Sequence, residues 1–590
     1  MKNPLKRILF AAILVCLPVV LILLLAEGFL RLTGFGYATT PLIRVQAGGE
    51  AVWAGNPDFT RLYFPAALKR LPSPVRVPVQ KPADTRRYMI VGGSAAAGDP
   101  DPDFSIARNL EWILSAAHPD INWEVLNLAY TACNSHVAEE VVRQSASYGL
   151  DGILVLVGNN EVIGPFGPGT TLTESLPPLW RRDMEIALRK TKLGQLGQIL
   201  RERLAGGPAN EEAWRGMQHF LEHRIAFGDP RLEQVYANFR ANLEDMNTGA
   251  ERRGIPILLA NVPVNLFDQP PFQDDTGALP ENLKSATMQY LQTGQSPLPL
   301  HEVLAAAQSY PQSAHLAWMA GRLLFEKHRT SEADAFLRRA RDLDRLRFRA
   351  DSRLNAIIEE EWEKSGTSLL PLDAEAPLIA DNPRHALGFP HFYEHVHFSL
   401  RANFLIAWEM ARALLGYENL DTTHLDNLDW TQAAAALAYT PYEAWLILEE
   451  IGRRFGQPPF TDIPGYGRLT AWMDTLRESL HARISTAEEK ESMTGTYLTA
   501  IRNRPDDDRI KLNFANFLAA FERAEAAYAI MEELYPRNPT DSEVAIAMLN
   551  LSLKLGHNDK AREALARIER IFPEHPNLDK FRSEIRTAGK

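Results

Sequence analysis

The stretch RRYMIVGGSAAAG, residues 86–98, decides the fold that this chain predicts. A short apolar run ends abruptly at Gly92 and Gly93, which indicates a strand followed by a sharp turn. Ser94 then begins the next segment, at the edge of the predicted sheet where the ligands of α/β proteins bind. A simpler interpretation also fits Ser94, in which it only caps the following helix.

Four further apolar runs repeat this pattern along the chain. They lie at residues 123–131, 151–160, 255–264 and, more weakly, 367–375. Their near-continuous apolar character is typical of strands buried on both faces in a parallel sheet. Between the first two runs, apolar residues from Ile106 to Leu114 recur at helical spacing. The alternation of strands and helices predicts a doubly wound α/β domain.

Composition and charge narrow the class of protein. The 590 residues are 45% hydrophobic and 23% charged, which is typical of globular domains, and the length predicts about two to four of them. A net charge of −11 does not favour a nucleic-acid partner. Cys16 and Cys133 lie in very different segments, and no cluster has the spacing of metal ligands. We therefore expect no disulfide framework, no metal and no cofactor.

Four short motifs, in order along the chain, carry a resemblance to a known family. They are Gly92-Gly93-Ser94, the segment NLAYTACNSH that contains Ala132, Gly158-Asn159-Asn160-Glu161, and Glu394-His395-Val396-His397. Each follows a predicted strand. Together they resemble the four sequence blocks of the SGNH hydrolases, also called GDSL-type esterases. The resemblance covers about residues 86–165, 229–268 and 367–415, and it implies a flavodoxin-like, three-layer α/β/α fold.

The resemblance implies a role for each of five residues. Ser94 would be the nucleophile, His397 the base and Glu394 the carboxylate that orients the imidazole. The amides of Ser94 and Ala132 and the side chain of Asn160 would bind the oxyanion. The chemistry of the side chains leads to the same roles, because a serine hydroxyl needs a base and the tetrahedral intermediate needs donors.

Three positions depart from the blocks of the family. Gly93 stands where the family has aspartate, Ala132 where it usually has glycine, and Glu394 where it has aspartate. None of these changes removes a required group. We expect the last two to tune rate or specificity.

Other polar residues near the motifs have structural interpretations. We expect structural or surface roles for three histidines, His136, His391 and His395. Cys133 is predicted to be a small buried residue rather than a second nucleophile. Asn265 and Asp268 follow the fourth predicted strand and fit either the lining of the site or the cap of a loop.

The N-terminus predicts a membrane anchor over residues 1–31. Basic residues precede an apolar run from Ile8 to Ala26, which is close to the ~20 residues that cross a bilayer as a helix. The rival interpretation is a cleaved signal peptide, but the run lacks the small residues of a cleavage site. The positive-inside rule then places the rest of the chain outside the cytoplasm.

Two parts of the chain resemble tetratricopeptide repeats. Pro505 and Pro539 are separated by the repeat length of 34 residues, and Gly556 marks a turn between helices. A single unit at about residues 285–350 has Gly321 and Ala333 at the positions where paired helices pack closely. We expect an all-α C-terminal region that binds a partner protein, with a purely structural helical cap as the alternative.

These features together predict the organisation of the chain. An N-terminal transmembrane anchor (1–31) and a Pro-rich connector (32–84), forming a stalk or a strap, precede the hydrolase domain (85–415). That domain carries helical insertions at about 165–228 and 285–350. A helical linker region (416–485) and the repeats (486–590) follow.

The predicted function follows from the resemblance and the topology. We expect a membrane-anchored, extracytoplasmic serine hydrolase that acts on acyl esters, with O-acetyl groups of carbohydrate as one example. One alternative is an O-acetyltransferase of an envelope polysaccharide that uses the same triad. The other is a non-catalytic scaffold in which the repeats carry the function.

Overall fold

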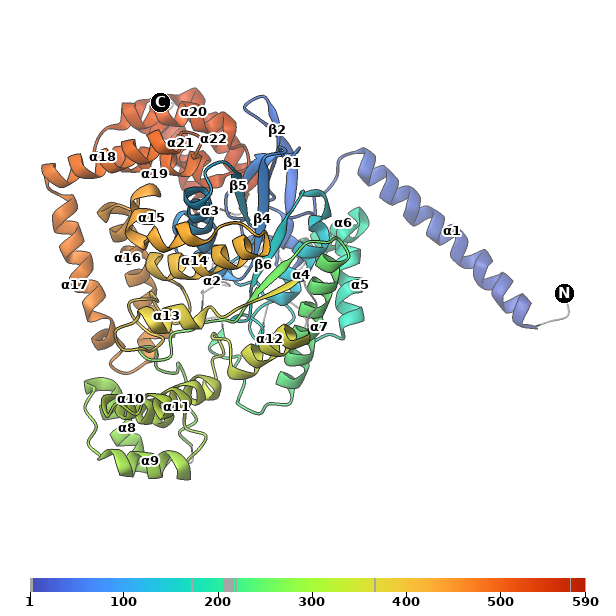
Figure 1. Ribbon diagram of the computed structural model, residues 1–590. Helices are drawn as coiled ribbons and strands as arrows, with labels where there is room; N and C mark the ends of the chain where they lie inside the picture. Colours follow the sequence, from blue (N-terminus) through green and yellow to red (C-terminus); the bar gives the residue numbers. More distant parts are fainter. Residues whose placement is uncertain are drawn as a thin grey trace.

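A parallel sheet with helices on both faces forms the centre of the molecule (Figure 1). The computed structural model describes residues 4–170, 175–204, 217, 220–277, 279–364, 368–573 and 575–588, and their side chains except those of 4–16 and 588. The strands are β4 (Thr85–Gly92), β5 (Asn122–Asn127), β6 (Gly152–Leu156), β7 (Ile257–Ala260) and β8 (Leu369–Leu372). Their spatial order is β5-β4-β6-β7-β8. This corresponds to the 2-1-3-4-5 order of flavodoxin-like sheets.

The strands alternate their side chains between two cores. Tyr88 and Ile90 of β4 face the core of α3 (Ile106–Ala117) and α14 (Leu400–Tyr417). Met89 and Val91 face the core on the opposite side, which holds α4 (Ser135–Gln144), α7 (Arg231–Glu251) and α12 (Ser352–Lys364). Burial on both faces is the reason that the strands appear as continuous apolar runs.

Each of the five predicted apolar runs overlaps a strand, so this part of the prediction is confirmed. The runs at 123–131, 151–160 and 255–264 are longer than β5, β6 and β7. Their last residues leave the sheet and form buried loops at its carboxyl edge. The α/β class with a parallel sheet and a helical C-terminal region is likewise confirmed.

Residues 32–84 form a small domain-like layer of their own. β1 (Leu42–Ala47), β2 (Glu50–Gly55) and β3 (Arg76–Pro78) make a three-stranded antiparallel sheet. The 3-10 helices η1 (Phe59–Leu62) and η2 (Ala66–Leu68) lie between β2 and β3. Phe59, Tyr63 and Phe64 are fully buried in the core that also contains α4. Of the two interpretations of this segment, the strap describes the structure and the stalk does not, because these aromatic residues give it a buried face.

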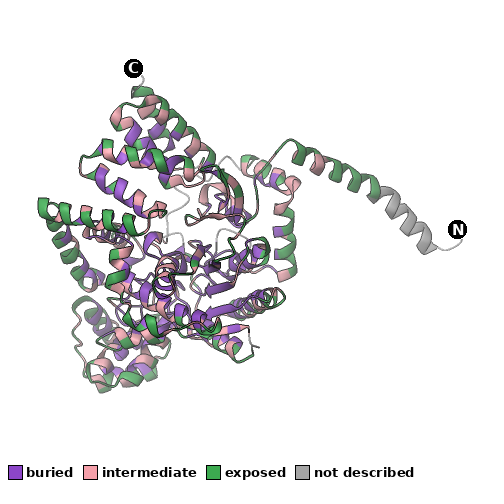
Figure 2. Cartoon of the chain, turned by 45° about the horizontal axis from the view of Figure 1, so that its top comes forward, coloured by how far each residue is buried: buried purple, intermediate pink, exposed green. Residues whose placement is uncertain are grey.

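Helix α1 (Pro4–Leu32) covers the predicted anchor and projects away from the body of the molecule (Figures 1 and 2). Most of its apolar side chains from Leu17 to Leu25 are exposed. Among the described residues, no helix has both the length and the apolar character needed to cross a membrane. The side chains of residues 8–16, which belong to the predicted apolar run, lie outside the described part of the chain.

The two predicted insertions contain helices. The first has α5 (Leu179–Lys190) and α6 (Lys192–Leu204), and parts of it (171–174, 205–216 and 218–219) lie outside the described residues. The second has α8 (Glu281–Thr293), α9 (Leu300–Ser309), α10 (Ala314–Glu326) and α11 (Thr330–Leu343). In the α10–α11 hairpin, a Cβ on Gly321 would lie 2.8 Å from the Leu337 side chain. The two helices therefore pack closely at Gly321, and a larger residue there would displace Leu337.

The remaining helices follow the sheet in the chain. They are α13 (Glu375–Asp381), α15 (Trp430–Ala436), α16 (Pro441–Phe455), α17 (Tyr466–Ile484), α18 (Ala487–Asn503), α19 (Asp508–Ala520), α20 (Ala524–Arg537), α21 (Ser542–Leu555), α22 (Asn558–Ile571) and α23 (Leu578–Ala588). Short 3-10 helices are η3 (Pro102–Phe104), η4 (Ser145–Ser147), η7 (Thr423–Asn427) and η8 (Phe460–Asp462).

The C-terminal helices dock on the sheet domain beside α3 (Figure 1). Arg108 of α3 donates to Asp507 at 2.5 Å, and Arg509 of α19 donates to Asp103 at 2.6 Å. Asp507 also caps the N-terminus of α19. The contact therefore fixes the start of the repeats against the sheet domain.

Candidate active site

Ser94 lies at the carboxyl end of β4, on the first residue of the short helix α2 (Ser94–Ala97). Both glycines before it are closely packed, and at Gly92 the obstacle to a side chain is the backbone of β6. A Cβ on Gly92 would lie 2.0 Å from the Leu156 carbonyl oxygen, and one on Gly93 would lie 2.8 Å from Asn160 Nδ2. Gly93, not Ser94, is the N-cap residue of α2. The interpretation of Ser94 as a simple cap is therefore wrong, because its side chain makes a different contact.

That contact is with the histidine of the last motif. His397 Nε2 lies 2.7 Å from Ser94 Oγ. On the other side of the ring, Nδ1 contacts Oε1 of Glu394, and the same oxygen accepts a hydrogen bond from the His397 amide at 3.0 Å. If Nδ1 carries the proton that Glu394 accepts, Nε2 presents its lone pair to the serine hydroxyl. The structure thus brings Ser94, His397 and Glu394 into one chain of contacts.

A tight turn between α13 and α14 holds Glu394 against His397. Phe392 and Phe398 form an isolated bridge across it, and the Tyr393 amide donates to the His397 carbonyl oxygen at 2.8 Å. Asn265, in the loop that follows β7, supports the turn because its side chain donates to the Glu394 carbonyl oxygen at 3.0 Å. Of the two interpretations of Asn265, the structural one describes this contact.

His395 contacts the other oxygen of the same carboxylate and packs among aromatic rings. Its Nδ1 lies against Oε2 of Glu394, and its ring packs edge-on against Phe272 at a centroid distance of 5.2 Å and Phe348 at 5.9 Å. The side chain is buried, and burial holds the pKa of His395 well below its usual range. Asp268, the other residue after β7, accepts hydrogen bonds from the Phe389 amide and from Arg322.

The predicted oxyanion residues lie together beside Gly93. Asn160 Nδ2 donates to the Cys133 carbonyl oxygen at 2.9 Å. The residue before Cys133, Ala132, has φ +58°, a left-handed conformation that favours glycine.

Sequence reasoning missed a second carboxylate at the imidazole. Asp99 Oδ2 lies 3.2 Å from His397 Nε2, the nitrogen that also faces Ser94. Arg454 of α16 donates to both oxygens of Asp99, at 2.5 and 3.0 Å. Burial raises the pKa of Asp99, but the charges of His397 and Arg454 lower it by more. Asp99 follows the serine motif closely and could have been noticed; Arg454 lies in a helix with no motif.

These surroundings set the protonation of the base. Burial lowers the pKa of His397 to about 4, with Asp99 acting in the opposite direction and Arg454 in the same one. At neutral pH the imidazole is therefore uncharged and able to accept the serine proton.

The other residues considered from sequence form structural contacts. His136 is buried against Arg182 and Asn242, and His391 contacts Asp381 at 2.6 Å. Burial raises the pKa of the Cys133 thiol, which disfavours the thiolate that a second nucleophile would need. Within the described residues, no group of three or more His, Cys, Asp or Glu side chains could hold a metal ion.

Comparison with known families identifies the C-terminal region. Residues 518–585 match the model of the tetratricopeptide repeat family, from the last turn of α19 into α23. The predicted repeats are therefore confirmed over this range. No curated protein matches the chain.

Proposed function

We infer that the protein is a serine ester hydrolase of SGNH type. The observation that carries this proposal is the 2.7 Å contact between Ser94 Oγ and His397 Nε2, with Glu394 on the other ring nitrogen. The contact joins residues that are far apart in the sequence, at the edge of the sheet where α/β enzymes bind ligands. The resemblance of the four motifs adds independent support.

In the proposed reaction, Ser94 Oγ attacks the carbonyl carbon of an ester while His397 Nε2 takes the hydroxyl proton. The developing oxyanion accepts hydrogen bonds from the amides of Ser94 and Ala132 and from Asn160. His397 then gives its proton to the departing alcohol, which leaves an acyl-Ser94 ester. Water attacks that ester with His397 again as the base, and the acid and free Ser94 are formed.

Two carboxylates assist His397 in this scheme. Glu394 fixes the ring through Nδ1. Asp99 faces Nε2 at 3.2 Å, so its negative charge stabilises the imidazolium that forms when the proton arrives. Arg454 holds this carboxylate in place by two hydrogen bonds. The helical linker region therefore contributes to the proposed site.

We also propose that the hydrolase works outside the cytoplasm at a membrane, on acyl esters such as O-acetyl carbohydrate, with the repeats recruiting a partner protein. The location rests on the basic residues before the apolar run Ile8–Ala26 and on the exposed apolar face of α1. Fractionation tests it: the protein should stay with membranes and be released by detergent. Recovery in the soluble fraction without detergent would contradict this location.

Labelling with a fluorophosphonate probe tests the activity itself. The probe should attach to Ser94 of the wild-type protein, and a panel of acyl esters should then be hydrolysed. Ser94→Ala should abolish both signals. Probe attachment to another residue, or ester hydrolysis that survives in Ser94→Ala, would contradict the proposal.

A further inference from the structure

Helix α5 carries an apolar stripe on its outer face. Trp180, Met184 and Leu188 recur at every fourth position, so they lie along one side of the helix, and their exposed fractions are 67, 58 and 58%. The opposite side of α5 holds the buried Arg182 and Ile186, which fix the helix on the body of the molecule. Large apolar side chains exposed in a row indicate a surface that contacts another apolar body.

The stripe ends beside the point where α1 is attached to the body. Thr191 alone separates α5 from α6. Glu27 of α1 accepts hydrogen bonds from the amides of Lys192 and Leu193 at 3.0 and 2.9 Å, so it satisfies two of the N–H groups at the start of α6. Figure 1 shows α5 and α6 on the side of the body from which α1 projects. The stripe and the base of α1 are therefore neighbours.

The apolar run of α1 ends at the same place. It extends from Ile8 to Ala26, and the next residue is Glu27. With this run in a bilayer, as the proposed location requires, no length of chain remains between the lipid and the start of α6. Leu25 and Phe29, on either side of Glu27, are both exposed. The attachment through Glu27 therefore holds the body against the lipid on the side that carries the stripe.

The charge of the two helices favours anionic lipid. Residues 179–204 contain seven basic and three acidic residues, in a chain whose net charge is −11. Arg201 and Arg203 of α6 are exposed, and within the part of the chain that the structure describes they have no ion-pair partner. Basic residues beside exposed tryptophan and leucine are typical of helices that lie in the interface of a membrane. A surface of anionic lipid fits both the stripe and these cations.

We propose that α5 and α6 lie on an anionic membrane surface, with Trp180, Met184 and Leu188 inserted between the headgroups and the upper acyl chains. Arg201 and Arg203 meet lipid phosphates at the edge of this contact. The contact adds to the anchor, because a single helix lets the body turn over the membrane, whereas a second attached surface orients it. The proposal rests on the proposed membrane location and does not depend on ester hydrolysis.

Quenching by lipid-borne nitroxides tests the contact in the full-length protein. A nitrobenzoxadiazole label is attached at Met184→Cys in a Cys16→Ala background, where the remaining Cys133 is buried. The protein is reconstituted in vesicles of phosphatidylcholine and phosphatidylglycerol, with and without lipids that carry a nitroxide on the acyl chain. We expect a blue-shifted emission and a loss of about half of it or more to the nitroxide lipids.

The matched control is a label at Leu476→Cys. This leucine is also exposed, but it lies on α17, on the far side of the body from α1 (Figure 1). Its label should keep its emission in the same vesicles. Equal quenching at residues 184 and 476 would overturn the proposal, because it would show adsorption without a preferred face.

Substitutions of arginine test the contribution of charge. Arg201→Gln together with Arg203→Gln should reduce the quenching at residue 184 by about twofold, to the value found in vesicles of phosphatidylcholine alone. Arg483→Gln, at an exposed arginine of α17, should leave that quenching unchanged. Undiminished quenching in the double variant would overturn the predicted contact with anionic lipid.

Flotation of the same vesicles separates the contact from the anchor. Protein that floats with the vesicles while the label at residue 184 stays unquenched would overturn the contact and leave the anchor unaffected. Protein that does not float would overturn both. A blue shift that grows with protein concentration, without quenching by nitroxide lipids, would place a second copy of the chain on this face and would overturn the lipid surface.

Discussion

The proposed active site and the interface with the repeats both bury charged side chains, but they use them differently. At the site, His397 lies between Ser94, Glu394 and Asp99, so a proton that its ring accepts from Ser94 would have a carboxylate beside each ring nitrogen. At the interface, Arg509 is shared among Asp103, Asp541 and Glu543. No proton needs to move there. Substitutions at the site should therefore change rate, and those at the interface should change stability.

The largest expected effect comes from the two groups that exchange the proton. Ser94→Ala and His397→Ala should each reduce kcat/KM by about 10⁴-fold or more, because neither group works without the other. For the same reason, the double variant should be no slower than either single one. Ester kinetics measure the loss of rate, and thermal melting measures stability. The melting temperatures of these variants should stay close to that of the wild type.

His395 is the control for this pair, because it contacts the same carboxylate from the other side. His395→Gln should retain far more activity than His397→Ala. A complete loss in His395→Gln together with a mild effect of His397→Ala would exchange the roles of the two histidines and refute the proposed triad.

The second effect concerns the oxyanion. Asn160→Ala should lower kcat by about 10²–10³-fold, the usual loss for one oxyanion donor. Asn159 in the same motif is the matched control, since its side chain accepts a hydrogen bond from the Ala350 amide at 2.9 Å. Asn159→Ala should reduce the melting temperature and leave kcat nearly unchanged. If the two variants behave alike, Asn160 is a structural residue.

A third, smaller effect distinguishes the influence of Asp99 on the pKa of His397 from that of Arg454. In the proposed reaction His397 must be neutral to accept the serine proton, so kcat/KM should rise with pH through its pKa of about 4 and then level off. Asp99 raises that pKa and Arg454 lowers it. Asp99→Asn should therefore move the acid limb to lower pH, and Arg454→Met to higher pH, each by about one unit. Shifts in the same direction would show that the pair acts only through structure.

At the interface, the prediction concerns stability rather than rate. It involves Glu443 of α16, whose carboxylate accepts a hydrogen bond from the Tyr497 hydroxyl of α18. Burial, with the charge of Asp101, raises the pKa of Glu443 to about 8. The folded protein therefore keeps a proton on this carboxyl group at pH values where the unfolded chain, with the ordinary pKa of glutamate, has lost it. Between about pH 4.5 and 8, the folded state binds more protons, and stability falls as pH rises. Glu443→Gln removes this contribution.

Melting temperature as a function of pH measures that contribution. From pH 5 to 8, the melting temperature of Glu443→Gln should fall less than that of the wild type, by on the order of 2 °C. Its kcat/KM should not change, although α16 also carries Arg454. If Glu443→Gln changed the rate and left the pH dependence of melting unchanged, the assignment of stability to the interface and rate to the site would be wrong.

The same two regions differ in how far sequence could predict them. The strands were visible because burial on both faces leaves continuous apolar runs, and the motif residues were visible because each follows such a run. Asp99 lies close to Ser94 in sequence, but its partner Arg454 is 355 residues away and belongs to no pattern. A contact between side chains so distant in the chain depends on docking of whole elements.

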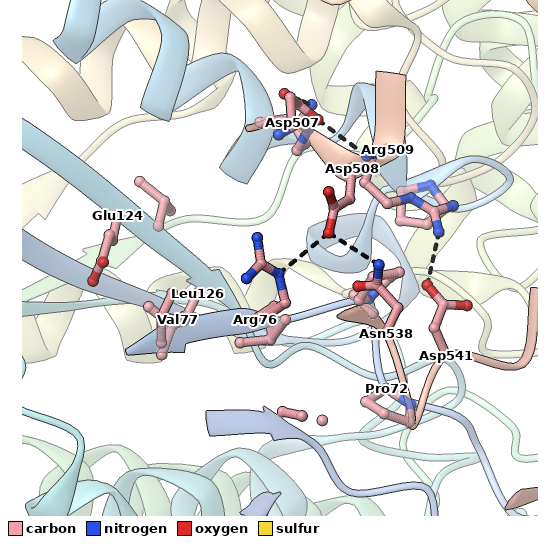
Figure 3. Close-up of a pocket in the computed structure, with 18 of the residues that line it drawn as sticks. Pro72, Arg76, Val77, Glu124, Leu126, Asp507, Asp508, Arg509, Asn538 and Asp541 are labelled. Atoms are coloured by element: carbon pink, nitrogen blue, oxygen red, sulfur yellow. Dashed lines mark hydrogen bonds and ion pairs between the residues drawn. The ribbon is translucent and has the colours of Figure 1, made fainter. Parts of the chain in front are cut away.

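Docking also explains the other features that sequence could not predict. The N-terminal sheet contains prolines that suggested a stiff connector, whereas its buried Phe59 and Tyr63 determine how it packs. The lining of the cavity between β3, β5 and the repeats comes from segments that are far apart along the chain (Figure 3). Repeat periodicity predicted the helices of the C-terminal region, but not the surface against which they lie.

The smallest expected effect is at Ala132, where the site stores a little backbone strain. With φ +58°, an alanine costs about 1–2 kcal/mol relative to its preferred conformations. Ala132→Gly relieves that cost but gives the unfolded chain about 0.4–1 kcal/mol of extra freedom. The balance favours a gain of about 0.5–1 kcal/mol, visible as a slight rise in melting temperature.

The amide donor stays in place in Ala132→Gly, so turnover of a small acetyl ester should change by less than about twofold. Esters with longer acyl chains should be hydrolysed faster, because the methyl group beside the oxyanion is gone. A large loss of acetyl-ester turnover would show instead that the methyl group holds this loop in its working conformation, and the contrast between a site that sets rate and an interface that sets stability would no longer hold at Ala132.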